Sequence, residues 1–352
     1  MNDTARREHI SAVTVWERIM HFLFRITGQA QERINGSTGH PFRVIVNKEI
    51  SDQVRSWRFI ILVAIIALTC MGSMYTALSS ISKAVKTSDP EGAFFFLRLF
   101  TVTDGTLPSF FVFISFLGPL LGIGLGFDSV NSELHRGTLS RVLSQPLHRD
   151  SLINAKFTAA LTVIGVMIAA LGYLVMGIGL ISTGIAPTLE EFIRINLFIL
   201  LSVVYIAFWL NLSMYFSVRF KQAATSALAG LAVWLFFTLF YPLMVNLLTK
   251  AIEPSEYAPP QIIYLFEKFK FILVQIMPNQ LFSEATTTLL MPSVRSLGPL
   301  TIEQVQGTLP GPLPLGQSLL VVWPQVTGLI AITILLFALT YHSFMRMEIR
   351  SR

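Results

Sequence analysis

Charged residues are scarce in this sequence. Only 13% of its 352 residues are Asp, Glu, Lys or Arg, whereas 53% are hydrophobic, and a soluble domain carries about 25% charged residues. Charge this sparse cannot cover the surface of a soluble protein of this length, so lipid is the expected solvent. Cysteine is scarcer still, because Cys70 is the only one. A disulfide framework within the chain is therefore excluded.

The motifs of common catalytic sites are also missing. No G-x-x-x-x-G-K-[ST] loop is present, so we do not expect this chain to bind and hydrolyse ATP alone. The histidines lack metal-ligand spacing and no G-x-S-x-G elbow occurs. We therefore predict no catalytic residue, no metal site and no enzyme activity. The net charge of +6 is better explained by cationic loops at a membrane than by a nucleic-acid partner.

Six apolar segments are long enough to span a bilayer. Their central turns contain essentially no Asp, Glu, Lys or Arg, which argues against a proton channel or an ion-coupled secondary transporter. The stretch Ile262–Ile276 is apolar but short and charged, so we interpret it as an interfacial or re-entrant helix, with a seventh span as the lesser alternative. The six segments lie near residues 59–81, 109–127, 153–181, 195–218, 223–248 and 319–344.

The basic residues predict which way the chain faces. Six spans put both termini on one side, and most of the 26 lysines and arginines fall in the segments of that side. The positive-inside rule then predicts that both termini lie on the cytoplasmic side of the cell (plasma) membrane. The segments assigned to the opposite face contain only Lys83, Lys86, Arg98, Arg194, Lys250, Lys268, Lys270 and Arg295.

These observations predict an all-α polytopic membrane protein with six transmembrane helices. Residues 1–40 form a cytoplasmic extension, 41–58 an amphipathic cytoplasmic interfacial helix, 59–344 the six-helix domain and 345–352 a cytoplasmic tail. A long extracytoplasmic segment, 249–318, separates helices five and six. It is rich in proline, and we favour a structural lid over a docking site for an outside partner.

The second span has glycines at four-residue spacing, Gly118, Gly122 and Gly126. Small residues on one face let two helices approach closely. The stripe predicts helix packing, either within the chain or against a second copy.

The connection between spans two and three, residues 127–157, is polar and basic. Its leucines recur at helical spacing between Gly137 and Pro146, so it predicts a short amphipathic helix joined stiffly to two spans. Such an element could transmit motion from a soluble partner. An ordinary interfacial loop is an equally good interpretation of the pattern alone.

Several strings in the sequence resemble the ABC-2 type permeases, the membrane subunits of ABC exporters whose ATPase is a separate chain. They are ELHRGTL at 133–139, LSQPLHR at 143–149 and AKF at 155–157, where Ala155 stands in place of the family's usual glycine. VNKEI at 46–50, PNQLFSEA at 278–285 and FMRMEIR at 344–350 also agree. The resemblance covers residues 41–352.

The resemblance implies a coupling helix that sits in a groove of the ATPase. It implies two ATPase subunits as partners, with ATP and Mg bound there and no cofactor in this chain. It also implies a second permease copy or a related permease, beside the lipid bilayer. The residues assigned to ATPase coupling are Glu133, Arg136, Gly137, Thr138, Leu139, Leu143, Pro146 and Arg149.

Three functions remain open at this point. The leading one is the permease of an ATP-driven exporter. The second is a non-transporting subunit that passes mechanical force from an ATPase to an extracytoplasmic partner, and the least favoured is a secondary transporter. The sequence does not predict a substrate.

Overall fold

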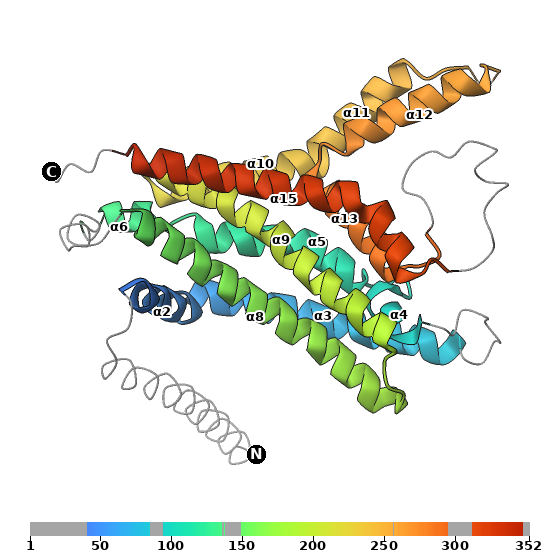
Figure 1. The fold of residues 1–352 in the computed structure, drawn as a ribbon, viewed down its shortest axis with the longest axis horizontal. Helices are drawn as coiled ribbons and strands as arrows, with labels where there is room; N and C mark the ends of the chain where they lie inside the picture. The colour runs from blue at the N-terminus through green and yellow to red at the C-terminus, as the bar shows by residue number, and fades with distance from the viewer. Residues whose placement is uncertain are drawn as a thin grey trace, which may run out of the picture.

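The computed structural model describes residues 41–84, 94–135, 137, 149–255, 257–294 and 312–347, and over these residues the chain is helical with no strand. Six of its helical segments are long and apolar enough to cross a membrane, which confirms the predicted fold class. They run side by side as a bundle (Figure 1). Their bounds are Trp57–Ser80, Phe110–His135, Arg149–Thr183, Leu189–Arg219, Ala223–Ala251 and Leu315–Met345.

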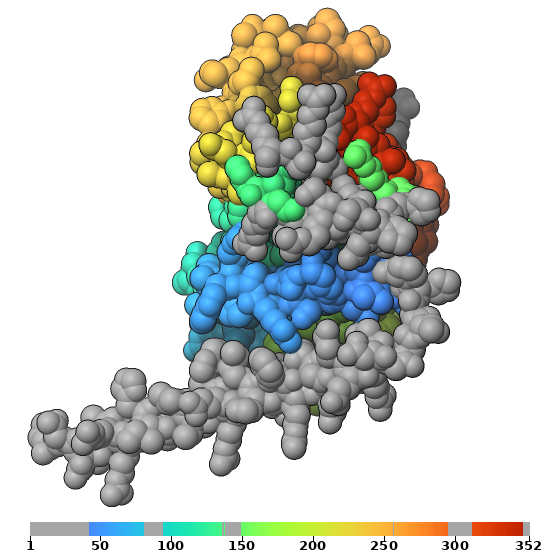
Figure 2. All heavy atoms as spheres, turned by 90° about the vertical axis from the view of Figure 1, so that its left-hand side faces the viewer, coloured from blue at the N-terminus to red at the C-terminus, as the bar shows by residue number. Residues whose placement is uncertain are grey.

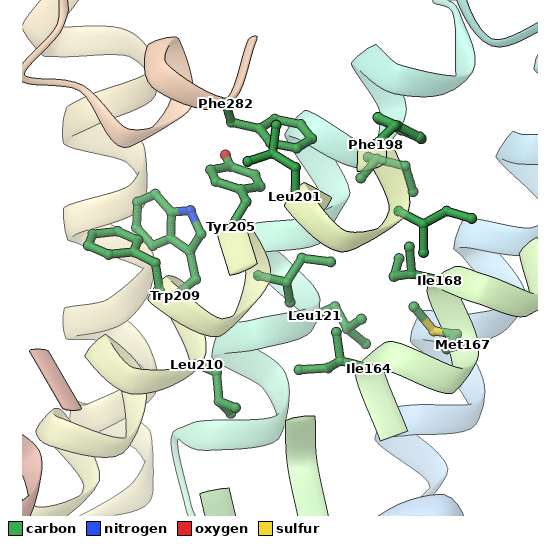
Figure 3. Close-up of a cluster of buried hydrophobic side chains, with 14 of the residues drawn as sticks. Leu121, Ile164, Met167, Ile168, Phe198, Leu201, Tyr205, Trp209, Leu210 and Phe282 are labelled. Atoms are coloured by element: carbon green, nitrogen blue, oxygen red, sulfur yellow. The ribbon is translucent and has the colours of Figure 1, made fainter. Parts of the chain in front are cut away.

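Helix α9 (Leu189–Arg219) is the centre of the bundle. It packs against α5 (Phe110–Gly126), α8 (Arg149–Thr183) and α15 (Leu315–Met345). Its apolar side chains meet those of α5 and α8 in the buried cluster that Figure 3 shows. Because α9 touches so many neighbours, it fixes where the ends of the other helices lie.

The glycine stripe of α5 faces α9 of the same chain. A Cβ added at Gly122 would lie 2.7 Å from the carbonyl oxygen of Ile206, and one at Gly126 would lie 2.8 Å from that of Leu210. Backbone atoms therefore meet backbone atoms where the two helices cross, which only glycine permits. Of the two kinds of packing that the glycine stripe predicts, the structure thus contains the one within a single chain.

Shorter helices cover the two ends of the bundle (Figure 1). Helix α2 (Pro41–Val54) lies against α8 at the end where α6 (Asn131–His135) follows α5. Helix α3 (Trp57–Ala84) continues from α2 along the bundle. At the opposite end, α4 (Phe95–Thr101) packs among α3, α8 and α5.

The fifth span bends away from the bundle partway along its length. Helix α10 (Ala223–Leu235) passes through a π-helical turn, η2 (Phe236–Phe240), into α11 (Tyr241–Ala251). Pro242 lacks the amide that would continue the helical ladder, which favours such a break. Beyond the turn, α11 and α12 (Pro260–Val274) project from the bundle as an arm, and α12 has no buried residue (Figure 1).

The chain returns from this arm through α13 (Pro278–Leu290). This helix is part of the bundle, because it packs on α9 and α15 and most of its residues are buried. The ring of Phe282 stacks on Tyr205 of α9 with 4.3 Å between centroids. The segment between spans five and six thus contains both an exposed helix, α12, and a packed helix, α13.

Candidate functional site

The predicted coupling loop begins and ends on described residues. Helix α6 carries Glu133, Gly137 ends the turn that follows it, and α8 begins at Arg149. Gly137 has a φ of 65°, a left-handed conformation that strongly favours glycine. The remaining residues assigned to coupling lie outside the described residues and stay predictions: Arg136, Thr138, Leu139, Leu143 and Pro146.

A buried ion triad joins three segments at this end. The Lys156 Nζ lies 2.7 Å from Glu133 Oε1 and 3.0 Å from Glu49 Oε2. Lys156 is only 4% exposed and Glu49 8%. An ammonium this buried is tolerated only with close partners of opposite charge. The triad therefore fastens α2, α6 and α8 to one another, and Figure 2 looks onto this end of the bundle.

Helix length explains how Lys156 can sit in an apolar span. At about 1.5 Å per residue, the 35 residues of α8 extend about 52 Å, and the hydrocarbon core of a bilayer is about 30 Å thick. The first turns of α8 therefore reach beyond the core. Lys156, about two turns from the start, can lie at the polar boundary.

The start of α6 is held by α9. The Ser217 hydroxyl accepts hydrogen bonds from the backbone amides of Val130 (3.0 Å) and Asn131 (3.2 Å). These amides belong to the first turn, which has no partners within its own helix. Ser217 supplies the missing acceptor and is 1% exposed. Helix α6 is thus fixed by α9 at its start and by Lys156 through Glu133.

Two further contacts tie the ends of the loop to neighbouring spans. Arg149 donates from Nη1 to the carbonyl oxygen of Met347, just beyond α15, at 3.4 Å. Asp128, at the start of the loop, pairs with Arg58 of α3, whose guanidinium lies 4.9 Å from the centroid of Phe127. Both ends of the loop are therefore mounted on more than one membrane helix.

Sequence reasoning identified Glu133 but missed its partners. Glu49 and Lys156 stood in matched strings without a role assigned to them. A single lysine inside an apolar span was the available signal, because such a residue needs a counter-charge. Nothing in the spacing of residues 49, 133 and 156 shows that they meet, because the packing of α2, α6 and α8 brings them together in space.

A second buried cation marks the opposite end of the bundle. Arg194 of α9 is fully buried and donates to Glu190 of the same helix at 2.8 and 3.0 Å. It also donates to the carbonyl oxygens of Leu289 (3.0 Å) and Leu313 (2.7 Å) and to the Ser318 hydroxyl (3.1 Å). One guanidinium thereby links the ends of α9, α13 and α15 through hydrogen bonds.

The neighbouring Glu191 fixes α4. Its carboxylate accepts from the backbone amide of Phe96, in the first turn of α4, at 2.8 Å. It also forms a capping box with Thr188 at the start of α9. A carboxylate suits a helix start because free amides and the positive end of the helix dipole are there. No cluster of His, Cys, Asp and Glu suited to a metal occurs in the part of the chain that the structure describes.

Comparison with known proteins agrees with this architecture. Residues 43–349 match the sequence profile of a family described as "ABC-2 family transporter protein". The chain is also similar to a protein of Pseudomonas aeruginosa described as "Probable ABC transporter permease protein NosY". The two are 26% identical over 212 residues, which is 56% of this chain and 67% of the relative.

Proposed function

This chain belongs to the ABC-2 family of transporter proteins, and on that basis we propose that it is the permease subunit of an ATP-driven exporter. ATP and Mg bind a separate ATPase chain, present in two copies, and a second permease completes the complex. The α6 end of the bundle receives the motion of the ATPase. The spans convert that motion into export across the cell membrane.

The observation that carries this proposal is the triad of Glu133, Lys156 and Glu49. A loop transmits force only if its ends are stiffly attached, and this loop has Glu133 and Arg149 held at its two ends. Movement of α6 would be passed to α8 by the Glu133–Lys156 contact, and from there to α2 by the Lys156–Glu49 contact. In this proposal α2 therefore moves together with the membrane helices.

Orientation fits this role. The excess of basic residues on the side of the termini supports a cytoplasmic position for α2, α6 and the end of α15. ATP is available there. The tip of the arm, where the fifth span ends and α12 follows, then lies toward the exit side.

The test is ATPase association and stimulation in the intact complex. Glu133→Lys places a cation beside Lys156, and Gly137→Pro forbids the left-handed turn. We expect each to lower permease-stimulated ATP hydrolysis about tenfold, the effect of about 1.4 kcal/mol. Glu267→Gln, a carboxylate change at an exposed position of α12, is the matched control and should leave association intact. Normal stimulation in both α6 variants would refute the coupling role.

A second candidate function is favoured by the projecting arm. The tip of this helical hairpin, which reaches toward the exit side, could pass force to an extracytoplasmic partner without transport. Uptake of labelled candidate solutes into inverted vesicles distinguishes the two functions. ATP-dependent accumulation supports export, whereas ATP hydrolysis coupled only to binding of an outside protein supports force transmission.

A further inference from the structure

Helix α13 brings into the bundle a carboxyl group that the central turns of the six spans do not supply. Glu284 lies in the middle of this helix and is 7% exposed. Its Oε1 accepts a hydrogen bond from Gln280 Nε2 at 3.0 Å. Its Oε2 accepts from Gln325 Nε2 of α15 at 3.1 Å and from Gln275 Nε2 at 3.5 Å. The buried carboxyl group is thus surrounded by neutral amides.

Among the described residues, no cation pairs with this carboxylate. The ion pairs that these residues form leave Glu284 out, whereas Lys156 and Arg194 each have an opposite charge beside them. Amide donors solvate a buried negative charge but do not cancel it, and a buried acid without a counter-charge can be neutralised by taking up a proton. Glu284 is therefore placed as a proton acceptor.

Few charged or titratable groups surround this position. Helix α9 packs along α13 between Arg194, which donates to the Leu289 carbonyl, and Tyr205, which donates to Asn279. No such group lies between Arg194 and Tyr205 on α9, and α5 and η2 contain none. The other neighbouring helices contribute Arg98 of α4, Tyr341 and His342 near the end of α15, and Tyr264, Glu267, Lys268 and Lys270 of α12.

Gln325 contains the acceptor that a protonated Glu284 requires. Its side chain is 3% exposed, and its Oε1 has no donor among the residues that the structure describes. A buried acceptor without a donor is unfavourable. Because Nε2 of the same amide already contacts Glu284, a half-turn of the amide brings Oε1 to that contact. The proton of a carboxylic acid would then supply the missing donor.

We propose that Glu284 is a proton-binding site and that its proton is shared with Gln325. The carboxylate takes one proton from water at Oε2, and the new O–H donates to Oε1 of the turned amide. A proton requires no free volume, which suits groups this buried. The contact between α13 and α15 thereby changes its hydrogen bonding with acidity.

Water can approach the site through Gln280. This residue is half-buried and lines a cavity of about 300 Å³ together with Ser115, Thr238 and Ser283, and polar cavities of this kind hold water. Gln325 lies ten residues from the start of α15 and twenty from its end, which puts it about 15 Å from the start. In the orientation of the proposed function, on which this step rests, the proton comes from the exit side.

Infrared difference spectroscopy of the full chain in phosphatidylcholine vesicles tests the site. As the pH is lowered from about 8 to about 4, a range that includes the ordinary pKa of glutamate, we expect the C=O band of a carboxylic acid that is shielded from water. Glu284→Gln keeps the size of the side chain and should abolish this band. Glu267→Gln, at an exposed position of α12, is the matched control and should remove only absorption of a hydrated acid. A shielded band that survives in Glu284→Gln, or is absent from the wild-type chain, refutes the site.

Two amide variants test the hydrogen bonds separately. Gln280→Met removes a donor to the carboxylate but no acceptor of the acid proton, so the band should be half-formed at an about tenfold lower proton concentration. Gln325→Met removes the acceptor of the acid proton, so the band should shift in frequency while Glu284 still titrates. An unchanged frequency in Gln325→Met would overturn the shared proton.

A pH gradient across sealed vesicles identifies the side from which the proton comes. The band should follow the pH at the face opposite the termini, and a band that follows the other face would overturn access from the exit side. The infrared measurement needs no ATPase, so it is independent of the coupling role. Absence of the band together with normal permease-stimulated ATP hydrolysis would remove the proton site and leave the exporter proposal intact.

Discussion

Among the residues that the structure describes, each end of the bundle buries one cation, and the two ends hold it in different ways. Lys156 at the α6 end is neutralised by two carboxylates from two other helices, Glu49 and Glu133. Arg194 at the α4 end pairs with Glu190 of its own helix and also donates hydrogen bonds to two backbone carbonyls and to Ser318. Lys156 is thus held by two carboxylates, whereas Arg194 is held by one carboxylate, two backbone carbonyls and one hydroxyl.

The difference indicates separate roles. Backbone carbonyls near helix ends move only if the helices move, so Arg194 locks α9, α13 and α15 in one arrangement. The side chains of Glu49 and Glu133 retain 11% and 17% exposure and can shift while keeping hold of a flexible ammonium. This arrangement supports the proposed coupling role, in which α2, α6 and α8 would move together.

The largest expected effect comes from removing the rigid cation. Arg194→Leu leaves Glu190, two backbone carbonyls and Ser318 without the guanidinium donor, and should cost about 3–5 kcal/mol of stability. Thermal melting of the detergent-solubilised chain by size-exclusion chromatography measures the loss. Arg194→Lys is the comparison, since it restores charge without the fork of donors and should recover only part of the stability. Full recovery of stability by lysine would show that the charge at position 194, and not the geometry of its donors, stabilises this end of the bundle.

Removing the other cation should separate stability from coupling. Lys156→Met leaves two carboxylates facing each other and should cost about 3 kcal/mol together with most ATPase stimulation. Adding Glu49→Gln and Glu133→Gln removes the uncompensated charges, so melting should return toward normal while stimulation stays low. A triple variant that regains full stimulation would mean that the charges are dispensable for coupling.

The fold was largely predictable, and the sites were only partly so. Six spans followed from runs of apolar residues because a bilayer requires long, uncharged segments. Glu133 followed from a matched string, but its contact with Lys156 and Glu49 depends on how α8 and α2 pack, which periodicity does not encode. Arg194 entered the orientation argument only as a loop cation. Its partners at Leu289 and Leu313 are backbone carbonyls, which every residue has, so no sequence pattern marks them.

Packing at the two ends can be compared with glycine substitutions. A Cβ at Gly126, near α6, would lie 2.8 Å from the Leu210 carbonyl oxygen, whereas one at Gly179, near α4, would meet the end of the Leu99 side chain. Backbone cannot yield but a leucine can rotate, so Gly126→Ala should cost about 1–3 kcal/mol and Gly179→Ala less. Gly165→Ala in α8, where nothing lies within 4 Å, is the control and should melt at or above the wild-type temperature. Equal losses at positions 126 and 179 would show that the α4 end is as rigidly packed as the α6 end.

The smallest expected effect concerns the exposed pair beside the triad. Arg58 and Asp128 are 56% and 24% exposed, so water screens them and their pairing should contribute no more than about 1 kcal/mol. Arg58→Gln, Asp128→Asn and the double variant form a cycle whose coupling energy should fall further as salt is raised. Melting and ATPase stimulation are measured for all three. If Asp128→Asn lowers stimulation as much as Lys156→Met does, force enters the spans through α3 as well as α8, and burial alone does not identify the coupling contacts at this end.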